Sequence, residues 1–476
     1  MSDVNLEDIV SLAKRRGFIY QGSEVYGGLS GTWDYGPLGV QLKRNIMQLW
    51  WKMFVDERDD MYGVDAAILM NQKVWQASGH TETFADPMVE CMNCHNNFRA
   101  DKIDLKAPCP TCGKRETFSE PEQFNMMYKT VNGAKYRSID RKESAGMTAH
   151  VEWFNKKGEK EKEFNLRDQF NELGGFMFYD SSSVSYLRPE TAQGIFTNYK
   201  NVVDSFYPDL PFGIAQQGKA FRNEISPRDF IFRAREFEQM EIEFFVHPDK
   251  WEEAFETWRK AVWEWTKALG LPEAMVHELE VPEDDRAHYS KRTIDFEFDF
   301  PIGREELLGL AYRTDFDLKN IQDHSGKSME YTLKGSTERF IPHVIEPSFG
   351  LERALMAVLT AAYKEDEING EKRVYLQLPK HLAPVKCAVS PLLKNKPELA
   401  NKAKEVYAVL KKELGQVMWD DNGNIGKRYR RQDEIGTPYC ITIDFQTLED
   451  NTVTVRNRNT AEQTRVAIAE LLAYIA

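Results

Sequence analysis

"FRNEISPRDFIFRAREFEQMEIEFF", residues Phe221 to Phe245, places arginines and glutamates inside two apolar runs. Because side chains two positions apart in a strand share a face, the second run has one charged face and one apolar face. The charged face carries Arg235, Phe237, Gln239, Glu241 and Glu243, and the apolar face carries Met240, Ile242 and Phe244. Arg222 and Glu224 share a face of the first run, and the turn-forming segment from Ile225 to Asp229 follows them. The stretch therefore predicts an antiparallel hairpin with a long loop.

A charged face on such a hairpin has two interpretations. It either faces solvent and forms cross-strand ion pairs, or it forms one wall of a site for a charged ligand. For an arbitrary hairpin the first interpretation is favoured, so the sequence on either side has to decide between them.

The composition excludes some classes of protein. The chain has 476 residues, enough for about three domains, and its hydrophobic content of 42% is that of a globular protein. A net charge of −13 argues against binding nucleic acid through bulk charge, so any such binding must be local. No apolar run approaches the roughly 18 residues of a membrane span, and the N-terminal segment lacks the pattern of a secretory signal. We therefore expect a cytoplasmic protein without a membrane partner.

Four cysteines form two C-x-x-C pairs, Cys91 with Cys94 and Cys109 with Cys112, separated by fourteen residues. This spacing is typical of a zinc ribbon, in which each pair directs two thiolates at one tetrahedral ion. A disulfide-linked loop suits a secreted chain better, and a ribbon that had lost its metal would keep the same pattern. The sequence predicts a structural Zn²⁺ within residues 91–112.

Periodicity divides the chain into four segments. Residues 1–84 hold an amphipathic N-terminal helix and a long helix from Asp34 to Val55 that follows a Gly-Pro turn. Residues 85–180 look like an insertion that contains the ribbon and the charged run from Lys156 to Glu163. Residues 181–377 begin with the strand-like "SVSYLRPETAQGIF" and include the hairpin and a tryptophan-rich helix over 251–269.

The last segment, residues 378–476, alternates strands with helices. We expect one helix from about Lys396 to Leu414 and a final helix from about Thr460. This alternation predicts a small α/β domain with a mixed sheet.

In their order along the chain, these features resemble the motifs of class II aminoacyl-tRNA synthetases. The Gly-Pro-led helix is similar to the first class motif, Phe221 to Glu224 with Arg235 to Phe237 to the second, and Gly350 to Arg353 to the third. The blocks "YLRPETAQGIF", "RNEISPR", "REFEQMEIEFF", "RTDFDL" and "HVIEPSFG" resemble those of the dimeric glycyl-tRNA synthetase family. The resemblance covers nearly the whole chain, but little between Thr130 and Ser183 is similar to the family.

The resemblance implies an α+β fold with an antiparallel catalytic sheet flanked by helices, an inserted zinc ribbon and a C-terminal α/β anticodon-binding domain. It implies a homodimeric glycine–tRNA ligase that activates glycine with ATP and transfers it to the 3′ end of tRNA(Gly). The alternative is a synthetase-like accessory module without catalytic activity. Loss of Arg222, Glu224 or Arg353 would mark such a module, and all three are present.

The chemistry of activation explains the cationic residues. Negative charge develops where the amino-acid carboxylate meets the α-phosphate, and Arg222 suits that contact because a guanidinium binds two oxygens at once. Phe237 can stack on adenine, Arg353 can lie over the ring or contact the terminal phosphate, and Glu306 is a candidate ligand for the Mg²⁺ that accompanies ATP. The resemblance implies catalytic roles for Arg222, Glu224 and Arg353, and ATP binding by Arg222, Asn223, Glu224, Phe232, Arg233, Ala234, Arg235, Glu236, Phe237, Glu306, Leu307, Gly350, Leu351, Glu352 and Arg353.

Glycine offers only an ammonium and a carboxylate, so a selective site must hold the ammonium with carboxylates and leave no room beyond Cα. Glu190 and Glu241 are the expected ammonium partners, and larger amino acids would clash, so no editing domain is required. The resemblance implies a glycine site made of Arg99, Glu190, Phe237, Glu238, Gln239, Met240, Glu241, Glu346, Pro347, Ser348, Phe349 and Gly350. Arg99 fits equally well as a surface residue of the ribbon.

The stretch "GKRYRRQDEIG", Gly426 to Gly436, is the dense basic cluster of the last segment. Basic residues with an interleaved tyrosine are typical of surfaces that meet phosphates and unstacked bases. The expected tRNA contacts are Lys427, Arg428, Arg430 and Arg431, and the alternative is a solvated charged face.

Overall fold

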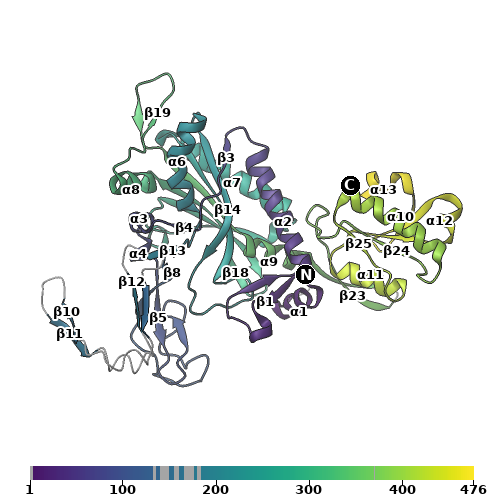
Figure 1. The fold of residues 1–476 in the computed structure, drawn as a ribbon, viewed down its shortest axis with the longest axis horizontal. Helices are drawn as coiled ribbons and strands as arrows, with labels where there is room; N and C mark the ends of the chain where they lie inside the picture. The colour runs from purple at the N-terminus through teal and green to yellow at the C-terminus, as the bar shows by residue number, and fades with distance from the viewer. Residues whose placement is uncertain are drawn as a thin grey trace.

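The structure is a computed structural model that describes residues 4–131, 136–139, 150–154, 160–165, 176–179, 184–368 and 370–475. Its main body surrounds a seven-stranded sheet, and the C-terminal segment forms a separate lobe (Figure 1). Helices are combined with sheets that are largely antiparallel, which confirms the expected α+β class. Among the described residues, no helix is both long and apolar enough to cross a membrane.

The central sheet contains the predicted hairpin. Its strands, in spatial order, are β16 (Val276–Glu280), β17 (Arg292–Phe300), β18 (Gly303–Thr314), β21 (His343–Gly350), β15 (Glu236–Val246), β14 (Phe212–Phe221) and β3 (Met61–Gly63). Neighbouring strands are antiparallel, except that β3 runs parallel to β14. The hairpin pairs Phe221 with Glu236, so Arg222 and Glu224 lie in the loop just beyond β14 rather than within the strand as expected.

One face of this sheet is covered by helices. Met240, Ile242 and Phe244 of β15 are buried there, as the alternation predicts, and each such side chain contributes about 1.5–3 kcal/mol. The covering helices are α1 (Leu6–Arg16), α2 (Pro37–Trp51), α7 (Trp251–Ala268) and α9 (Leu351–Ala362). The predicted Gly-Pro-led and tryptophan-rich helices are confirmed as α2, which has Pro37 at its first position, and α7.

The opposite face is only partly covered, by α6 (Ala192–Phe206), which packs against β14 and β15. In the stretch "SVSYLRPETAQGIF" the strand β13 (Val184–Leu187) ends before Arg188, and α6 begins at Ala192. The strand expected over the whole stretch is therefore too long. The bend leaves the segment from Arg188 to Thr191 beside the polar side chains of β15.

The ribbon region contains a small antiparallel sheet of β5 (Ala85–Glu90), β6 (Asn97–Arg99) and β7 (Glu122–Asn125). It follows two short helices, α3 (Gln72–Ala77) and α4 (His80–Thr83). Residues 156–159 lie outside the described residues and only the backbone is described for β11 (Lys160–Asn165), so the charged run from Lys156 to Glu163 stays a prediction.

The C-terminal lobe has a mixed five-stranded sheet, as predicted, in the order β25 (Val417–Trp419), β24 (Cys387–Pro391), β26 (Tyr439–Ile443), β27 (Thr452–Asn457) and β28 (Gln463–Ala467). Its helices are α10 (Pro397–Leu414), α11 (Ile425–Glu434), α12 (Phe445–Asp450) and α13 (Leu471–Ile475). The helix from Lys396 is thus confirmed as α10. The final helix expected from Thr460 is wrong, because β28 pairs with β27 first and α13 begins only at Leu471.

The remaining elements are short. They are β1 (Ile19–Gln21), β2 (Trp33–Tyr35), β4 (Leu69–Met70), β8 (Lys129–Val131), β9 (Tyr136–Ile139), β10 (His150–Phe154), β12 (Phe176–Tyr179), α8 (Phe316–Ser325), β19 (Tyr331–Thr332), β20 (Arg339–Phe340), β22 (Tyr363–Ile368) and β23 (Glu371–Leu376). The hairpin of β22 and β23 directly follows α9 and leads into the C-terminal lobe.

Gly39 allows α2 to pack closely against the chain that leads into β1. A Cβ at Gly39 would lie 1.8 Å from the carbonyl oxygen of Phe18. Helix propensity favours alanine over glycine by about 1 kcal/mol, but overpacking against fixed backbone costs about 1–3 kcal/mol or more. We expect Gly39→Ala to lower the midpoint of thermal unfolding of the main body by about 2–8 °C, measured by calorimetry.

Gly426→Ala in α11 is the matched control, because a Cβ there meets only Asn424 Oδ1 at 3.7 Å. It should leave the midpoint unchanged or raise it. A midpoint of Gly39→Ala equal to that of the wild type would contradict the packing argument.

Candidate active site

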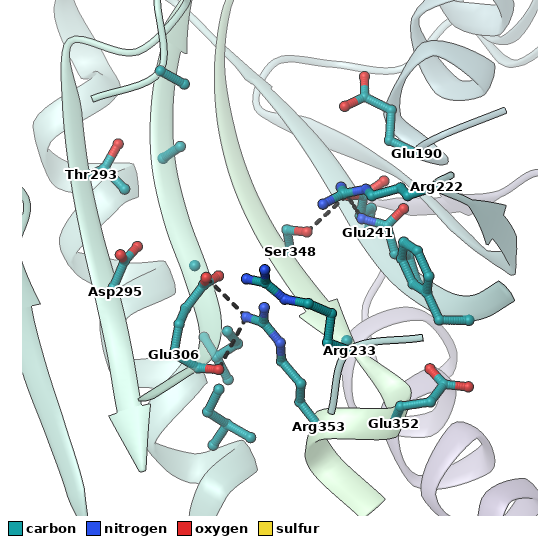
Figure 2. Close-up of a pocket in the computed structure, with 18 of the residues that line it drawn as sticks. Glu190, Arg222, Arg233, Glu241, Thr293, Asp295, Glu306, Ser348, Glu352 and Arg353 are labelled. Carbon is teal, nitrogen blue, oxygen red and sulfur yellow. Dashed lines mark hydrogen bonds and ion pairs between the residues drawn. The ribbon is translucent and has the colours of Figure 1, made fainter. Parts of the chain in front are cut away.

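A cavity of about 420 Å³ opens on the polar face of the central sheet. Figure 2 shows Glu190, Arg222 and Glu241 on one side of it, Asp295 and Glu306 on the other, and the side chains of Ser348 and Arg353 between them. The predicted residues that line it are Arg99, Glu190, Arg222, Glu224, Phe232, Arg233, Ala234, Phe237, Gln239, Glu241, Glu306, Leu307, Glu346, Ser348, Gly350, Glu352 and Arg353.

Several predicted residues lie away from the cavity because of strand alternation. Met240, Phe349 and Leu351 are buried in the core on the helical side of the sheet, and Glu238 forms an ion pair with Lys43 of α2 on that side. Pro347 alternates with Glu346 and Ser348 and does not line the cavity. The family motifs are contiguous in sequence, whereas only alternate residues of a strand reach one face. The side chains of Glu238, Met240, Pro347 and Phe349 therefore do not line the cavity, and that of Leu351, the first residue of α9, packs into the core. The roles in glycine and ATP binding that the resemblance implies for these residues stay predictions.

Three predicted ATP residues of the hairpin also lie outside the cavity lining. Glu236 is exposed and forms an ion pair with Lys219. The backbone N–H of Asn223 donates to the carbonyl of Met126 at 2.8 Å, and that of Arg235 donates to Gly31 at 2.7 Å. Asn223 and Arg235 thus fix the loop through their backbone, and the cavity lining does not support the roles in ATP binding that the resemblance implies for Asn223, Arg235 and Glu236.

Glu241 is held rigidly at one end of the cavity. Its Oε1 accepts hydrogen bonds from Ser348 Oγ at 2.8 Å and from Gln239 Nε2 at 2.8 Å, and its Oε2 accepts one from the backbone N–H of Thr191 at 3.0 Å. Burial and the nearby Glu190 raise the pKa of Glu241. A bound cation is therefore the ligand that best satisfies this carboxylate.

Arg313 is the buried counter-ion of this region, and sequence reasoning missed it. It binds Asp317 through two hydrogen bonds, at 2.8 and 2.9 Å, and donates to Glu346 Oε1 at 2.8 Å. Its guanidinium lies 3.7 Å from the ring centroid of Tyr289. The block "RTDFDL" contains Arg313 and Asp317, so the signal was present, although nothing local indicates Glu346 as a partner.

Carboxylates outnumber cations in this cluster. Burial raises the pKa of Glu346 to about 7 in spite of Arg313. Glu243 is fully buried, and neither of its carboxylate oxygens has a hydrogen-bond partner among the residues that the structure describes. Burial together with Glu346 raises its pKa well above the usual range. Burial without a paired charge therefore disfavours the ionised form of Glu243, and the excess of carboxylates over cations in this region suits a cationic ligand.

Arg222 lies next to this acidic end. Its Nε donates to the carbonyl oxygen of Pro189 at 3.2 Å, and its guanidinium lies 5.4 Å from the ring centroid of Phe84 and 5.2 Å from that of Phe237. The guanidinium lies near both aromatic rings and lines the cavity, where it can contact an anion.

The far end of the cavity carries Arg353 and two acidic residues. Nη1 of Arg353 lies 2.9 Å from Glu306 Oε2, and its guanidinium lies 4.7 Å from the ring centroid of Phe232. Arg353 lowers the pKa of Glu306, whereas burial and Glu306 raise that of Asp295 to about 7. Sequence reasoning missed Asp295, although the alternation of acidic and apolar residues in β17 places it on the cavity face.

The four cysteines lie together in the ribbon. Their sulfur atoms all lie within 4.8 Å of one another, with 3.7 Å between Cys91 and Cys112 and 3.8 Å between Cys94 and Cys109. Tetrahedral coordination with Zn–S bonds of about 2.3 Å requires sulfur separations of about 3.8 Å, whereas a disulfide requires about 2.05 Å. The donor set therefore fits Zn²⁺ and not a pair of disulfides.

The basic cluster of the C-terminal lobe lies on α11 and is largely used within the chain. Arg428 is 3% exposed, and its guanidinium donates to the carbonyl oxygens of Pro391, Asp421 and Gly423. Because its guanidinium is buried and already bonded to carbonyl oxygens, the structure does not support a contact of Arg428 with a phosphate. A basic run in the sequence does not reveal such backbone partners.

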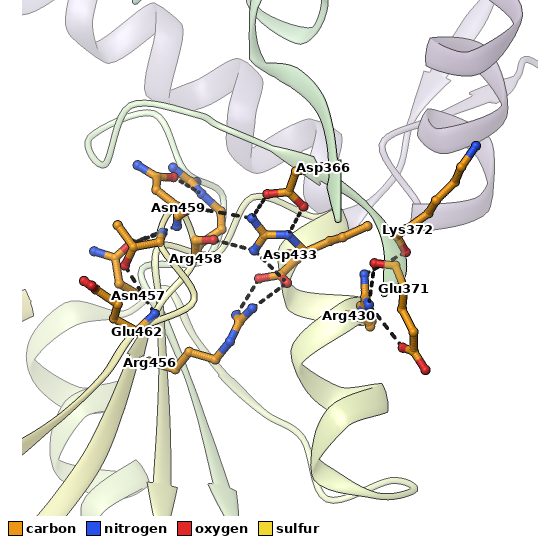
Figure 3. Close-up of polar contacts among 12 residues, drawn as sticks. Asp366, Glu371, Lys372, Arg430, Asp433, Arg456, Asn457, Arg458, Asn459 and Glu462 are labelled. Atoms are coloured by element: carbon orange, nitrogen blue, oxygen red, sulfur yellow. Dashed lines mark hydrogen bonds and ion pairs between the residues drawn. The ribbon is translucent and has the colours of Figure 1, made fainter. Parts of the chain in front are cut away.

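The other arginines of the cluster are also engaged. Arg430 donates to the carbonyl oxygen of Lys372 and contacts Glu371 of β23 (Figure 3), and Arg431 pairs with Asp420 at 2.6 Å. Lys427 is exposed. Contacts of Lys427, Arg430 and Arg431 with tRNA stay predictions, and the two arginines would first have to leave their present partners.

Asp433, also on α11, is completely buried and accepts hydrogen bonds from Arg456 of β27 (Figure 3). It also accepts one from Arg373 of β23. Arg373 also pairs with Asp366 of β22. This cluster joins the C-terminal lobe to the hairpin that follows α9.

Residues 176–362 match the family model of the tRNA synthetase class II core domain (G, H, P, S and T), and residues 386–476 match the model of an anticodon binding domain. The fold is thus that of a class II aminoacyl-tRNA synthetase, with a catalytic core domain and an anticodon binding domain.

The chain is 44% identical to the glycine–tRNA ligase of Clostridium acetobutylicum, over 99% of this chain and 98% of that protein. It is also 44% identical to the glycine–tRNA ligases of Streptomyces coelicolor, over 100% and 99%, and of Borrelia hermsii, over 99% and 97%. The chain belongs to the glycine–tRNA ligase family.

The zinc assignment makes a quantitative prediction. We expect one zinc ion per purified chain by mass spectrometry, and Cys109→Ser should lose most of it because three thiolates bind zinc more weakly than four. Cys440→Ser, at a buried cysteine outside the ribbon, is the control and should retain the ion. Equal zinc contents in the two variants would contradict the assignment.

Proposed function

We propose that this cavity activates glycine with ATP and transfers it to the 3′ end of tRNA(Gly). The observation that carries the proposal is that buried carboxylates, Arg222 and Arg353 line one cavity. Family membership supports an ATP-dependent ligase of this specificity.

Glycine binds at the acidic end. Its ammonium lies against Glu190 and Glu241, where it supplies the missing positive charge, and its carboxylate points towards Arg222. Because Glu241 is fixed by Ser348, Gln239 and Thr191, the ammonium site is preorganised and needs little rearrangement.

ATP occupies the rest of the cavity. Phe237 stacks on the adenine ring, and Arg222 stabilises the charge that develops at the α-phosphate during attack by glycine. Arg353 contacts the ring or the terminal phosphate after leaving Glu306. Glu306 and Asp295 would hold Mg²⁺, which neutralises phosphate charge when it is bound with ATP.

The transfer step needs tRNA and the C-terminal lobe. The match of residues 386–476 to an anticodon binding domain supports tRNA as the second substrate. The first class motif, on α2, is expected at a subunit interface, so we infer a homodimer, and the cytoplasmic location stays a prediction.

Glycine-dependent exchange of labelled pyrophosphate into ATP tests the activity directly. The wild type should exchange with glycine and not with alanine, and Arg222→Ala should lower kcat by about 100- to 1000-fold because a charge-stabilising donor is lost. Glu236→Ala is the control, because Glu236 is exposed and lies outside the cavity lining. Absence of exchange with any amino acid would instead support the non-catalytic accessory module.

The raised pKa of Glu346 predicts a pH dependence. With a pKa of about 7, Glu346 is largely neutral at pH 6 and ionised at pH 8, and only the ionised form attracts an ammonium. We expect kcat/KM for glycine, measured by exchange at saturating ATP, to rise between pH 6 and pH 8. Glu346→Gln should lower kcat/KM and flatten this profile, and a wild-type value that falls with pH would contradict the assignment.

A further inference from the structure

Glu190 is held from two sides by side chains that come from different parts of the chain. Its Oε1 accepts a hydrogen bond from Gln193 Nε2 at 3.3 Å, and its Oε2 lies 3.3 Å from His80 Nε2. His80 is buried, with 8% of its surface exposed. His80 has no role in the reaction proposed above.

The turn Ser78-Gly79-His80 gives the imidazole a single orientation. Ser78 follows α3, Gly79 has φ +82° as the turn requires, and Ser78 Oγ lies 2.8 Å from His80 Nδ1. The ring packs edge-on against Trp75, with 5.5 Å between centroids, and lies 5.3 Å from the ring of Phe84. The imidazole can therefore neither rotate nor move away from Glu190 without disturbing both rings.

The Ser78 hydroxyl has two acceptors within reach, because its Oγ lies 2.8 Å from Nδ1 of His80 and 3.4 Å from the carbonyl oxygen of Trp75. When the hydroxyl donates to Nδ1, the neutral imidazole carries its hydrogen on Nε2, which faces Glu190. When the hydroxyl donates to Trp75, Nδ1–H donates to Oγ, and Nε2 carries a hydrogen only in the imidazolium. The carboxylate of Glu190, 3.3 Å from Nε2, favours the states in which this nitrogen is a donor.

The charges around Glu190 agree with this arrangement. Burial alone would raise the pKa of Glu190, but His80, Arg313 and Arg222 outweigh it and hold the pKa at about 2. Glu190 is therefore ionised at neutral pH, as a partner of an ammonium must be.

We propose that His80 is a positioning residue for glycine, whose Nε2–H fixes Oε2 of Glu190 so that the carboxylate faces the substrate ammonium. This inference rests on the proposed function, which places the ammonium at Glu190. The contact of 3.3 Å tightens when glycine binds, because hydrogen bonds in substrate-free sites are often long.

A purely packing role for His80 makes a different prediction. Phe84, which contacts the imidazole, also lies 5.4 Å from the guanidinium of Arg222. Loss of packing would therefore disturb the contact of Arg222 with ATP as well as the glycine site. A positioning role changes the KM for glycine and leaves the KM for ATP nearly unchanged.

The test compares His80→Gln with His80→Asn in the full-length enzyme. The glutamine amide can place a donor near the position of Nε2, whereas the shorter asparagine amide reaches only the position of Nδ1. In pyrophosphate exchange, His80→Asn should raise the KM for glycine about 10- to 100-fold, as expected for losing a hydrogen bond to a charged group. His80→Gln should stay within about 5-fold of the wild type, and both should change the KM for ATP less than about 3-fold.

Each other outcome overturns the inference. Equal glycine KM values for the two variants would show that the Nε2 donor is irrelevant, and a parallel rise in the KM for ATP would show a packing role. Should one variant fail to fold by calorimetry, Ser78→Ala replaces it, because freeing Nδ1 should also raise the KM for glycine selectively. A wild-type enzyme without glycine-dependent exchange would overturn the proposed function itself, and this inference with it.

Discussion

The site depends on the pairing of one buried guanidinium with more carboxylates than it can neutralise. Arg313 is 1% exposed and binds Asp317 and Glu346, while Glu241 and Glu243 remain beside them on β15. A buried charge costs several kcal/mol unless it is paired, so this imbalance leaves three outcomes: protonation, access to water or a bound cation. The raised pKa of Glu243 is in the direction of the first outcome, and Glu241 and Glu190, at the edge of the cavity, are suited to the third. Recognition of a small ammonium is thus linked to how the core of the domain balances its charges.

The hairpin was predictable from sequence because its two faces differ at every second residue. The alternation placed Met240 in the core and Glu241 on the opposite face, and both positions are observed. Motif resemblance alone was less precise, because it treats a contiguous block as one site and therefore included Glu238 and Phe349, which face the helices. Resemblance locates the segment that forms the site, and strand alternation shows which of its residues face the cavity.

Two of the residues that sequence reasoning missed, His80 and Arg313, have partners far away in the chain. His80 contacts Glu190, which lies 110 residues later in the sequence, and Arg313 contacts Glu346, which lies 33 residues later. No local pattern encodes such pairs. For Arg428 the sequence predicts a functional contact that the structure does not support. A basic run suggests exposed side chains, but the guanidinium of Arg428 donates to backbone carbonyl oxygens inside the lobe.

The order of strands in the central sheet constrains how the chain can fold during synthesis. β21 joins the group of β16, β17 and β18 to the group of β15, β14 and β3, yet it is the last strand of the sheet to be made. Until Gly350 has left the ribosome, both groups keep an open edge whose backbone N–H and C=O groups lack a strand partner. The growing chain is therefore exposed to aggregation through these two edges until β21 has been made. A chain truncated before β21 has two incomplete sheets instead of a smaller version of the enzyme.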